Sequence, residues 1–349
     1  MKTNFGSEEF ERYARQIAFQ EIGPAGQEKL ARGRVMILGC GGLGAASASI
    51  LARAGVGYLK LVDRDFLELN NLQRQLLYEE HDVKEGLPKA IAAQHRIQQI
   101  NSTINTEAII ADANRFNIES LINDVDVIID ATDNFETRFL LNEACVKHSR
   151  PWIYGAAIES YGLTMTILPG ETACLRCVME KIPEPGTVPT CETVGVLASI
   201  VAIIASIQSA EAIKIIIGNK AAINRNLISI DVWQNSYQTI DIAKEKIQKN
   251  CPVCNQRWFD YLEGKHGSAF TTLCGRNAVQ ILPFKQTQLD LPRLAIQLAE
   301  LGVVKANEYL IRFEIENYEL SIFPDGRAIV KGTTDTAIAR SLYSRYVGN

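Results

Sequence analysis

The stretch Arg34-Val-Met-Ile-Leu-Gly-Cys-Gly-Gly-Leu-Gly44 decides the fold of this chain. Its first part, residues 34–38, is a short apolar run that indicates a buried strand. The glycines form a G-x-G-x-x-G pattern, and the small residues 44–54 indicate that a helix follows. Bare glycines let backbone amides approach a phosphate, and the positive end of a helix favours its charge. The stretch therefore predicts a nucleotide-binding strand, turn and helix.

Apolar runs and helical patterns continue to alternate after this unit. Strands that alternate with helices form a doubly wound, mainly parallel sheet, so the predicted fold class is α/β with a Rossmann-like sheet. The proline-rich residues 173–191 are predicted to form a long loop, and such loops are usually functional. The further strands are predicted at residues 58–62, 125–129, 152–154 and 163–168, and the helices at 88–100 and 136–149.

The chain has 349 residues, more than the roughly 100 to 200 of one domain, so a second unit is expected. The character of the sequence changes after Cys254. We predict a core domain at residues 1–254 and a small α+β domain at residues 255–349. The second domain contains a predicted helix at 291–301, strands at 309–315, 319–323 and 327–330, and a last helix capped by Asp335.

Composition argues against two broad classes of partner. Lys and Arg number 36 against 40 Asp and Glu, so the net charge of −4 offers no general attraction to nucleic acid or acidic membranes. Residues 193–210 carry no charge and are just long enough to test as a membrane span. Polar residues within them, and Glu211 directly after, favour a helix buried in the core or in a dimer interface. Residues 1–20 show no secretory signal, so we expect a cytoplasmic chain with reduced thiols.

Polar side chains gather where the predicted strands end, which is the edge where such sheets bind ligands. Arg74 and Lys89 can hold the phosphates of ATP and stabilise the charge that grows when the α-phosphate is attacked, and an Asp at the same edge can hold Mg²⁺. Asp63 can accept hydrogen bonds from ribose hydroxyls. Taken singly, each is more often a solvated surface group, and no G-x-x-x-x-G-K-[ST] motif supports P-loop phosphoryl transfer. The other candidate ligand-binding residues are Gly39, Gly41, Gly42, Gly44, Asp65, Asn70, Asn71, Gln73 and Asn134.

In this order and number, the motifs resemble the ThiF/MoeB/HesA family, whose members are relatives of the ubiquitin-activating enzymes. The resemblance covers residues 8–254, and residues 273–277 and 325–330 are similar to the C-terminal extension of Bacillus-type ThiF and MoeB proteins. It is carried by Arg12-Tyr13-Ala14-Arg15-Gln16, residues 39–44, Asp63-Arg64-Asp65, Asn71-Leu72-Gln73-Arg74-Gln75, Pro88-Lys89, Ala131-Thr132-Asp133-Asn134 and two Cys-x-x-Cys pairs.

The resemblance implies ATP-dependent adenylylation of the C-terminal glycine carboxylate of a ubiquitin-like sulfur carrier protein ending in Gly-Gly. The carrier would be ThiS-like, for the thiazole of thiamine, or MoaD-like, for molybdopterin, and a sulfur donor protein is a further candidate partner. By the same resemblance the roles are as follows: Gly42 lies against the nucleotide, Asp63 holds the ribose, Asn71 and Arg74 contact phosphates, Lys89 neutralises developing charge, Asp133 binds Mg²⁺, and Arg15 reaches into the partner site of a homodimer.

Eight cysteines are present, and four of them form the pairs Cys174/Cys177 and Cys251/Cys254. Four thiolates suit a tetrahedral structural Zn²⁺ with no open position for catalysis. The separation between the pairs is longer than in a zinc ribbon, and it is the resemblance that implies one shared site. The other interpretations of these four residues are unligated thiols or a redox pair.

Cys191 is the candidate nucleophile. We expect it at the N-terminus of the long apolar helix, where the helix favours a thiolate, although Glu192 beside it opposes this. The resemblance implies an acyl disulfide with the carrier in the ThiF branch and no essential role in the MoeB branch. Cys40 is predicted to serve packing, and Cys145 and Cys274 to be buried hydrophobic residues.

Three other interpretations stay open at this point. A NAD-dependent oxidoreductase shares the glycine motif and Asp63, but it gives no role to Arg74, Lys89 or Asp133. A non-catalytic scaffold that binds a ubiquitin-like partner would not need these residues intact. An adenylyltransferase that acts on a tRNA or peptide carboxylate would share every core motif, because these motifs do not identify the acceptor.

Overall fold

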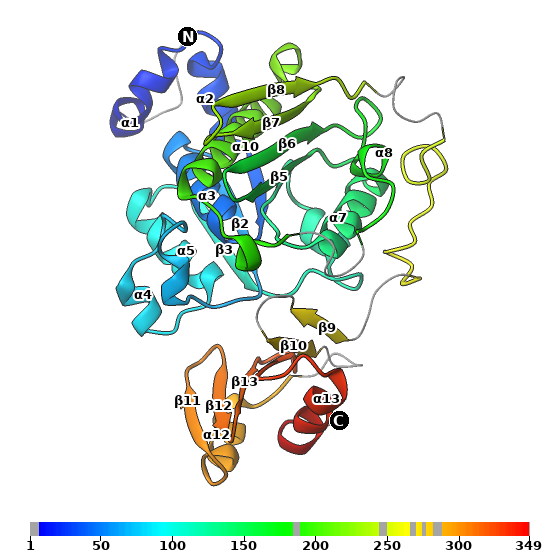
Figure 1. Cartoon of the computed structure of the whole chain (residues 1–349). Helices are drawn as coiled ribbons and strands as arrows, with labels where there is room; N and C mark the ends of the chain where they lie inside the picture. Colours follow the sequence, from blue (N-terminus) through cyan, green and yellow to red (C-terminus); the bar gives the residue numbers. More distant parts are fainter. Residues whose placement is uncertain are drawn as a thin grey trace. The chain divides into compact units, whose positions relative to one another are not determined.

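The computed structural model describes residues 7–183, 189–243, 250–265, 270–273, 277–281 and 288–348. They belong to two compact units, shown in Figure 1. The first consists of Met1–Pro183 and Val196–His266, and the second of Glu184–Gly195 and Gly267–Asn349. The predicted division after residue 254 stays a prediction. Cys274 lies outside the described residues.

The first unit is built on an eight-stranded sheet in the order β3-β2-β1-β4-β5-β6-β7-β8. The pairs from β3 to β5 are parallel, and the pairs from β5 to β8 are antiparallel. This confirms the Rossmann-like α/β prediction and adds an antiparallel extension. The strands are β1 (Arg34–Leu38), β2 (Tyr58–Asp63), β3 (Asn105–Ile110), β4 (Val127–Asp130), β5 (Trp152–Ile158), β6 (Tyr161–Ile167), β7 (Leu227–Asp231) and β8 (Ser236–Ile240).

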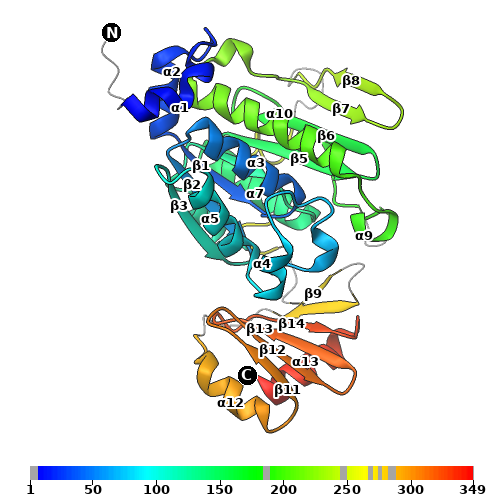
Figure 2. The same ribbon diagram turned by 90° about the vertical axis from the view of Figure 1, so that its left-hand side faces the viewer.

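Helices cover both faces of this sheet, as Figures 1 and 2 show. Side chains of a strand alternate between faces, so Val35 and Ile37 of β1 join the core under α2, α3, α5 and α10, whereas Met36 and Leu38 join the core under α6 and α7. The helical elements are α1 (Ser7–Ile17), α2 (Gly23–Arg32), α3 (Gly42–Ala54), η1 (Leu69–Asn71), α4 (Glu80–Lys84), α5 (Lys89–Ile100), α6 (Ile118–Ile122), α7 (Phe135–Lys147), α8 (Leu175–Val178), α10 (Ala198–Ile217) and η2 (Lys220–Ala222).

The long apolar helix does not begin beside Cys191, so that part of the prediction is wrong. Cys191–Val194 form a separate short helix, α9, which ends at Gly195. The φ of Gly195 is 81°, a left-handed conformation that a continuing helix cannot adopt. Helix α10 starts only at Ala198. By length and composition it could cross a membrane, with a mean hydropathy of 1.9, but 50% of that window is buried, and α10 packs on α3 and β5.

The second unit contains a six-stranded antiparallel sheet in the order β11-β12-β13-β14-β10-β9. Its apolar core includes Phe313, Leu320 and Val330. Asp335 caps the last helix as predicted, because its Oδ1 accepts a hydrogen bond from the Ala337 amide at 2.7 Å. The elements are β9 (Phe270–Leu273), β10 (Ala278–Ile281), α12 (Leu291–Ala299), β11 (Val303–Ala306), β12 (Ile311–Ile315), β13 (Tyr318–Ile322), β14 (Ala328–Lys331) and α13 (Thr336–Tyr346).

Candidate active site

The glycine turn lies at the carboxyl end of β1, against the loop that follows β4. A Cβ at Gly39, whose φ is 92°, would lie 2.6 Å from the Ala131 carbonyl oxygen. A Cβ at Gly44 would lie 1.8 Å from the Gly39 carbonyl oxygen. At Gly41 the nearest atom would be Nε2 of Gln75, at 3.8 Å. Gly39 and Gly44 are therefore required for backbone packing, whereas Gly41 leaves room for a ligand at the N-terminus of α3.

Gly42 differs from its neighbours because it faces another helix. A Cβ there would lie 2.9 Å from Cγ1 of Val201 on α10. The missing side chain thus lets α10 pack closely on the start of α3. Contact between Gly42 and the nucleotide stays a prediction.

Asp63 ends β2 and is 9% exposed. Its Oδ2 accepts a hydrogen bond from the Cys40 amide at 2.6 Å, and its Oδ1 accepts one from the Asp65 amide at 2.7 Å. Each carboxylate oxygen keeps a second lone pair that can accept a ligand hydroxyl. Burial raises the pKa of Asp63, and the positive charge of Lys89 opposes this. Asp63 therefore joins the glycine turn to the start of the next loop.

Lys89 begins α5 and is 5% exposed. Its Nζ lies 3.4 Å from Oδ2 of Asp65, which is also buried. Next to this pair, Nη1 of Arg64 lies 3.0 Å from Oδ1 of Asp112, the residue that follows the end of β3 by two positions. The edge of the sheet thus holds a buried cation that is already paired before any anionic ligand binds.

The loop after β2 carries the Asn71–Arg74 motif. Asn71 is buried, and its Nδ2 donates to Oδ1 of Asn70 at 2.8 Å. Arg74 is half-buried and donates from Nη1 to the Asn70 carbonyl at 2.9 Å. Asn70 and Gln73 are exposed. Gln75, which is 2% exposed and lies beside Gly41, was not among the predicted site residues. Its position next to Arg74 in the motif was the available signal.

The loop after β4 carries Asp133 and Asn134. Asp133 is exposed, and Oδ1 of Asn134 caps α7 by accepting the Thr137 amide at 2.8 Å. Behind the loop lie a buried carboxylate, Asp130, and a buried guanidinium, Arg138, with 3.3 Å between Oδ2 and Nε. The sequence analysis gave no role to either. The available signal was that Asp130 directly precedes the loop and that Arg138 lies on the first turn of α7, which follows it.

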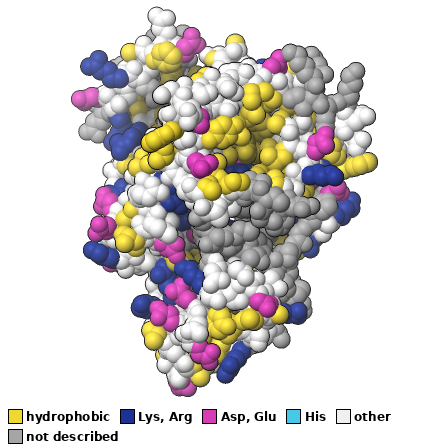
Figure 3. Space-filling model, in the orientation of Figure 1, with side chains coloured by type: hydrophobic (Ala, Val, Ile, Leu, Met, Phe, Trp, Pro, Cys, Tyr) yellow, Lys and Arg dark blue, Asp and Glu magenta, His cyan; other side chains and the backbone are white. Residues whose placement is uncertain are grey.

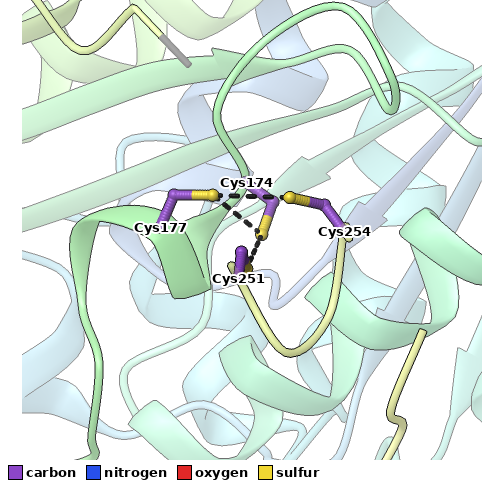
Figure 4. A group of neighbouring side chains, drawn as sticks. All are labelled: Cys174, Cys177, Cys251 and Cys254. Carbon is purple, nitrogen blue, oxygen red and sulfur yellow. Dashed lines mark hydrogen bonds between the residues drawn. The ribbon is translucent and has the colours of Figure 1, made fainter. Parts of the chain in front are cut away.

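The four cysteines of the two pairs meet in one cluster, drawn in Figure 4. Their sulfur atoms all lie within 4.8 Å of one another. Cys174 Sγ is 3.7 Å from the sulfurs of both Cys177 and Cys251, and Cys177 Sγ is 3.5 Å from that of Cys254. Four thiolates about 2.3 Å from one Zn²⁺ would be about 3.8 Å apart in a tetrahedron. The cluster therefore fits a zinc ion.

A neighbouring polar side chain supports this centre. Asn142 of α7 is fully buried, and its Nδ2 donates to Cys174 Sγ at 3.7 Å. Its Oδ1 accepts the Leu175 amide at 2.9 Å. Such a partner orients a metal-binding thiolate and stabilises its charge.

Two further residues were predicted to take part in catalysis, Arg15 and Cys191. Arg15 is exposed on α1, and no hydrogen bond or ion pair among the described residues joins it to the glycine turn. Cys191 is half-buried in the second unit. Because α9 has only four residues, the long-helix dipole that we expected to favour its thiolate does not act there.

Comparison with known proteins gives the family. Residues 13–253 match the ThiF family. The chain belongs to the ThiF family. It is 43% identical to a Bacillus subtilis protein named sulfur carrier protein ThiS adenylyltransferase, over 97% of this chain and 99% of that one. It is 36% identical to the SAMP-activating enzyme E1 of Haloferax volcanii, over 75% and 95%. A solved structure of E. coli MccB with ATP matches 70% of this ThiF-family chain and 74% of its own length, with TM-score 0.61 and 25% identity.

Proposed function

We propose that this chain uses ATP to adenylylate the C-terminal glycine carboxylate of a ubiquitin-like sulfur carrier protein. One observation carries the proposal: the 43% identity with the ThiS adenylyltransferase extends over 97% of the chain, the C-terminal unit included. The name of that relative favours a ThiS-like carrier over a MoaD-like one. We further propose that the reaction takes place in the cytoplasm.

The chemistry needs activation because a carboxylate must otherwise expel oxide. In the proposed step, a carboxylate oxygen of the carrier attacks the α-phosphorus of ATP and forms a new P–O bond. The bond between the α-phosphorus and the bridging oxygen breaks, and pyrophosphate leaves with that electron pair. The product is an acyl-adenylate, whose AMP is a good leaving group for a later sulfur transfer. Charge grows on the phosphate oxygens, so fixed cations accelerate the step.

The described residues can meet these needs. The open side of Gly41 and the N-terminus of α3 can receive phosphate oxygens, and the free lone pairs of Asp63 can accept ribose hydroxyls. Lys89 and Arg74 supply positive charge at the same edge. Mg²⁺ usually takes one or two carboxylates together with substrate phosphates and water, so the exposed Asp133 fits it as a single protein ligand. Bound there, Mg²⁺ would neutralise charge on the phosphates.

A protein substrate also needs a docking surface. Figure 3 shows apolar side chains gathered on the face of the first unit over β5 to β7. Tyr161 of β6 and Ile240 of β8 are exposed by 36% and 43%, and the pairing of Tyr161 with Asp231 and of Asp231 with Ser236 places them on the same face of the sheet. Exposed apolar patches on soluble proteins mark interaction sites. This supports a protein partner and leaves a tRNA acceptor without support.

The remaining assignments belong to the same proposal. We propose a homodimer in which Arg15 reaches the partner's nucleotide site, Zn²⁺ bound by the four cysteines, and a sulfur donor protein that acts after adenylylation. We propose that this donor transfers a sulfur to Cys191 as a persulfide, whose outer sulfur attacks the acyl-adenylate, so that AMP leaves and the carrier is held on Cys191 as an acyl disulfide. Capture of the carrier by the wild type and not by Cys191→Ser would support that last role, and equal capture by both would contradict it.

The test is exchange of labelled pyrophosphate into ATP. We expect exchange with a ThiS-like carrier that ends in Gly-Gly and none when its last glycine is deleted. Asp133→Ala should abolish most of the exchange, whereas Glu85→Ala, at the exposed acid directly after α4, should leave it unchanged. If neither a ThiS-like nor a MoaD-like carrier supports exchange, the proposed function is wrong.

A further inference from the structure

We propose that Arg138 is a positioning residue for Asp133: it fixes the loop that presents this carboxylate, and thereby sets the Mg²⁺ requirement of the reaction. The inference rests on the proposed function, in which Asp133 is the protein ligand of Mg²⁺. Arg138 itself is 6% exposed and lies beneath the loop.

The backbone of the loop is held from both sides. Nη2 of Arg138 donates to the Thr132 carbonyl at 2.6 Å. Oδ1 of Asp130 accepts both the Thr132 amide at 3.0 Å and the Thr132 hydroxyl at 2.7 Å. Three polar groups of the residue directly before Asp133 are thus fixed by one buried ion pair. Little freedom remains in the peptide that carries the Asp133 side chain.

The same guanidinium fastens this loop to the neighbouring strand. Nη2 of Arg138 also donates to the Gly155 carbonyl of β5 at 3.1 Å. Gln208 of α10 donates from Nε2 to the Asp130 carbonyl at 2.8 Å and to the Ile153 carbonyl at 3.0 Å. A Cβ at Gly155 would lie 2.4 Å from that Nε2. The pair is therefore part of a rigid junction of β4, β5 and α10.

Only arginine can make this set of contacts. Its planar fork can face the Asp130 carboxylate with Nε while Nη2 reaches two carbonyl oxygens. A lysine would keep the positive charge, but its single ammonium cannot occupy all these directions at once. Arg138→Lys should therefore keep a positive charge beside Asp130 and let the loop shift. Since a displacement of about 1 Å in a reacting group can cost about 10²-fold in rate, a small shift suffices.

Arg150 offers a matched control. It is a second arginine of the first unit that holds backbone carbonyls, because Nη1 donates to Val125 at 3.1 Å and Nη2 to Asn123. These carbonyls precede β4, at the amino end of the strand, whereas Arg138 acts at the carboxyl end. Arg150→Lys should lower the melting temperature and leave the Mg²⁺ requirement as in the wild type.

The first readout does not depend on a carrier protein. We would measure the rise in melting temperature that Mg²⁺ adds in the presence of a non-hydrolysable ATP analogue. We expect Arg138→Lys to lose most of this rise and Arg150→Lys to keep it. A wild type that shows no Mg²⁺-dependent rise, or an Arg138→Lys chain that retains it, would overturn the inference, whatever the outcome with carriers.

The second readout is pyrophosphate exchange against free Mg²⁺. Arg138→Lys should raise the Mg²⁺ concentration for half-maximal exchange and lower kcat by about 10-fold or more, with KM for ATP little changed. In an Asp133→Asn background, Arg138→Lys should have little further effect on kcat, because the carboxylate that Arg138 positions is absent. Fully additive effects would show that Arg138 stabilises the fold without positioning Asp133.

Discussion

At the scale of single residues, buried charged side chains at the carboxyl edge of the parallel strands lie beside oppositely charged partners. Lys89 is an example, because an unpaired ammonium in its place would be strongly disfavoured. Its Nζ lies 3.4 Å from Asp65 Oδ2, so the ion pair keeps the cation at the sheet edge before ATP arrives. A phosphate that approaches then meets a cation that is already desolvated and oriented, and its Coulombic attraction is little screened.

Lys89→Met tests this role. The substitution keeps the length of the side chain and removes the charge, so charge that develops at the α-phosphate loses its fixed partner. We expect kcat for pyrophosphate exchange to fall by about 10² to 10³-fold, with a smaller change in KM for ATP. Lys84→Met, at an exposed lysine that ends α4, should have no effect. Equal kcat values for Lys89→Met and wild type would contradict the assignment.

Gly41→Ala and Gly44→Ala should separate binding from folding. A methyl group at Gly44 collides with the Gly39 carbonyl, so Gly44→Ala should lower the free energy of unfolding by about 1 to 3 kcal/mol or more. At Gly41, whose φ is −75°, alanine fits and only occupies the space beside the turn. Gly41→Ala should therefore melt like the wild type and bind ATP at least about 10-fold more weakly. Calorimetric titration and thermal melts measure both. Normal ATP affinity in Gly41→Ala would exclude the turn as phosphate site.

At the scale of elements, Glu143 connects α7 to the segment after the second cysteine pair. It is 2% exposed, and its Oε2 accepts the amides of Tyr261 and Leu262 at 2.9 and 3.1 Å. Burial raises the pKa of Glu143 from 4.5 to about 7. The folded chain therefore holds this proton more tightly than the unfolded chain does.

The pH dependence of stability follows from this difference. The contribution of Glu143 to the free energy of unfolding is fully present below about pH 4.5 and is lost as pH rises through about 7. Between these two pH values the native state still binds a proton that the unfolded state has released. Glu143→Gln imitates the protonated form. The difference in unfolding free energy between this variant and the wild type should therefore grow in favour of the variant from pH 5 to pH 8. A difference that is constant with pH, measured in urea melts, would show that Glu143 titrates normally.

Local patterns predicted the elements whose residues carry their own signals. The apolar run at residues 34–38 is β1, and the small residues after the glycines form α3. The pattern did not reveal β7 and β8. Strand β7 pairs with β6, which lies far from it in the chain, and β8 pairs with β7. The pattern also placed the long helix too early, since its apolar composition continues through Gly195, where the backbone turns. At the candidate site, the motif selected residues such as Asp63, whose role in nucleotide binding stays a prediction. Asp130 and Arg138 were missed because their role depends on which carbonyls the folded loop presents.

At the scale of the whole molecule, the cysteine cluster joins two segments of the first unit that lie far apart in the sequence. One pair follows β6 and the other follows β8, and they meet beside the core that contains Trp152 and Met165. The helix α10 and the strands β7 and β8 lie between them in the sequence. A bound Zn²⁺ would therefore fasten the antiparallel extension of the sheet at both of its ends. This would be a structural task, because the four cysteines would occupy all four positions of a tetrahedral Zn²⁺.

Metal analysis and thermal melting test this structural role of Zn²⁺. We expect one Zn²⁺ per chain, and a fall in melting temperature of about 10 °C after chelation or in Cys251→Ser, since metal binding energy contributes to folding. Cys145→Ser is the matched control, because Cys145 is a buried thiol of the same core outside the cluster. It should keep its Zn²⁺ whatever it does to stability. Hydrogen exchange should rise first at residues 174–179 and 250–265, while the glycine turn at the carboxyl end of β1 stays protected. If Cys251→Ser retains zinc, or if the metal-free chain melts at the same temperature, the four cysteines form no structural zinc site.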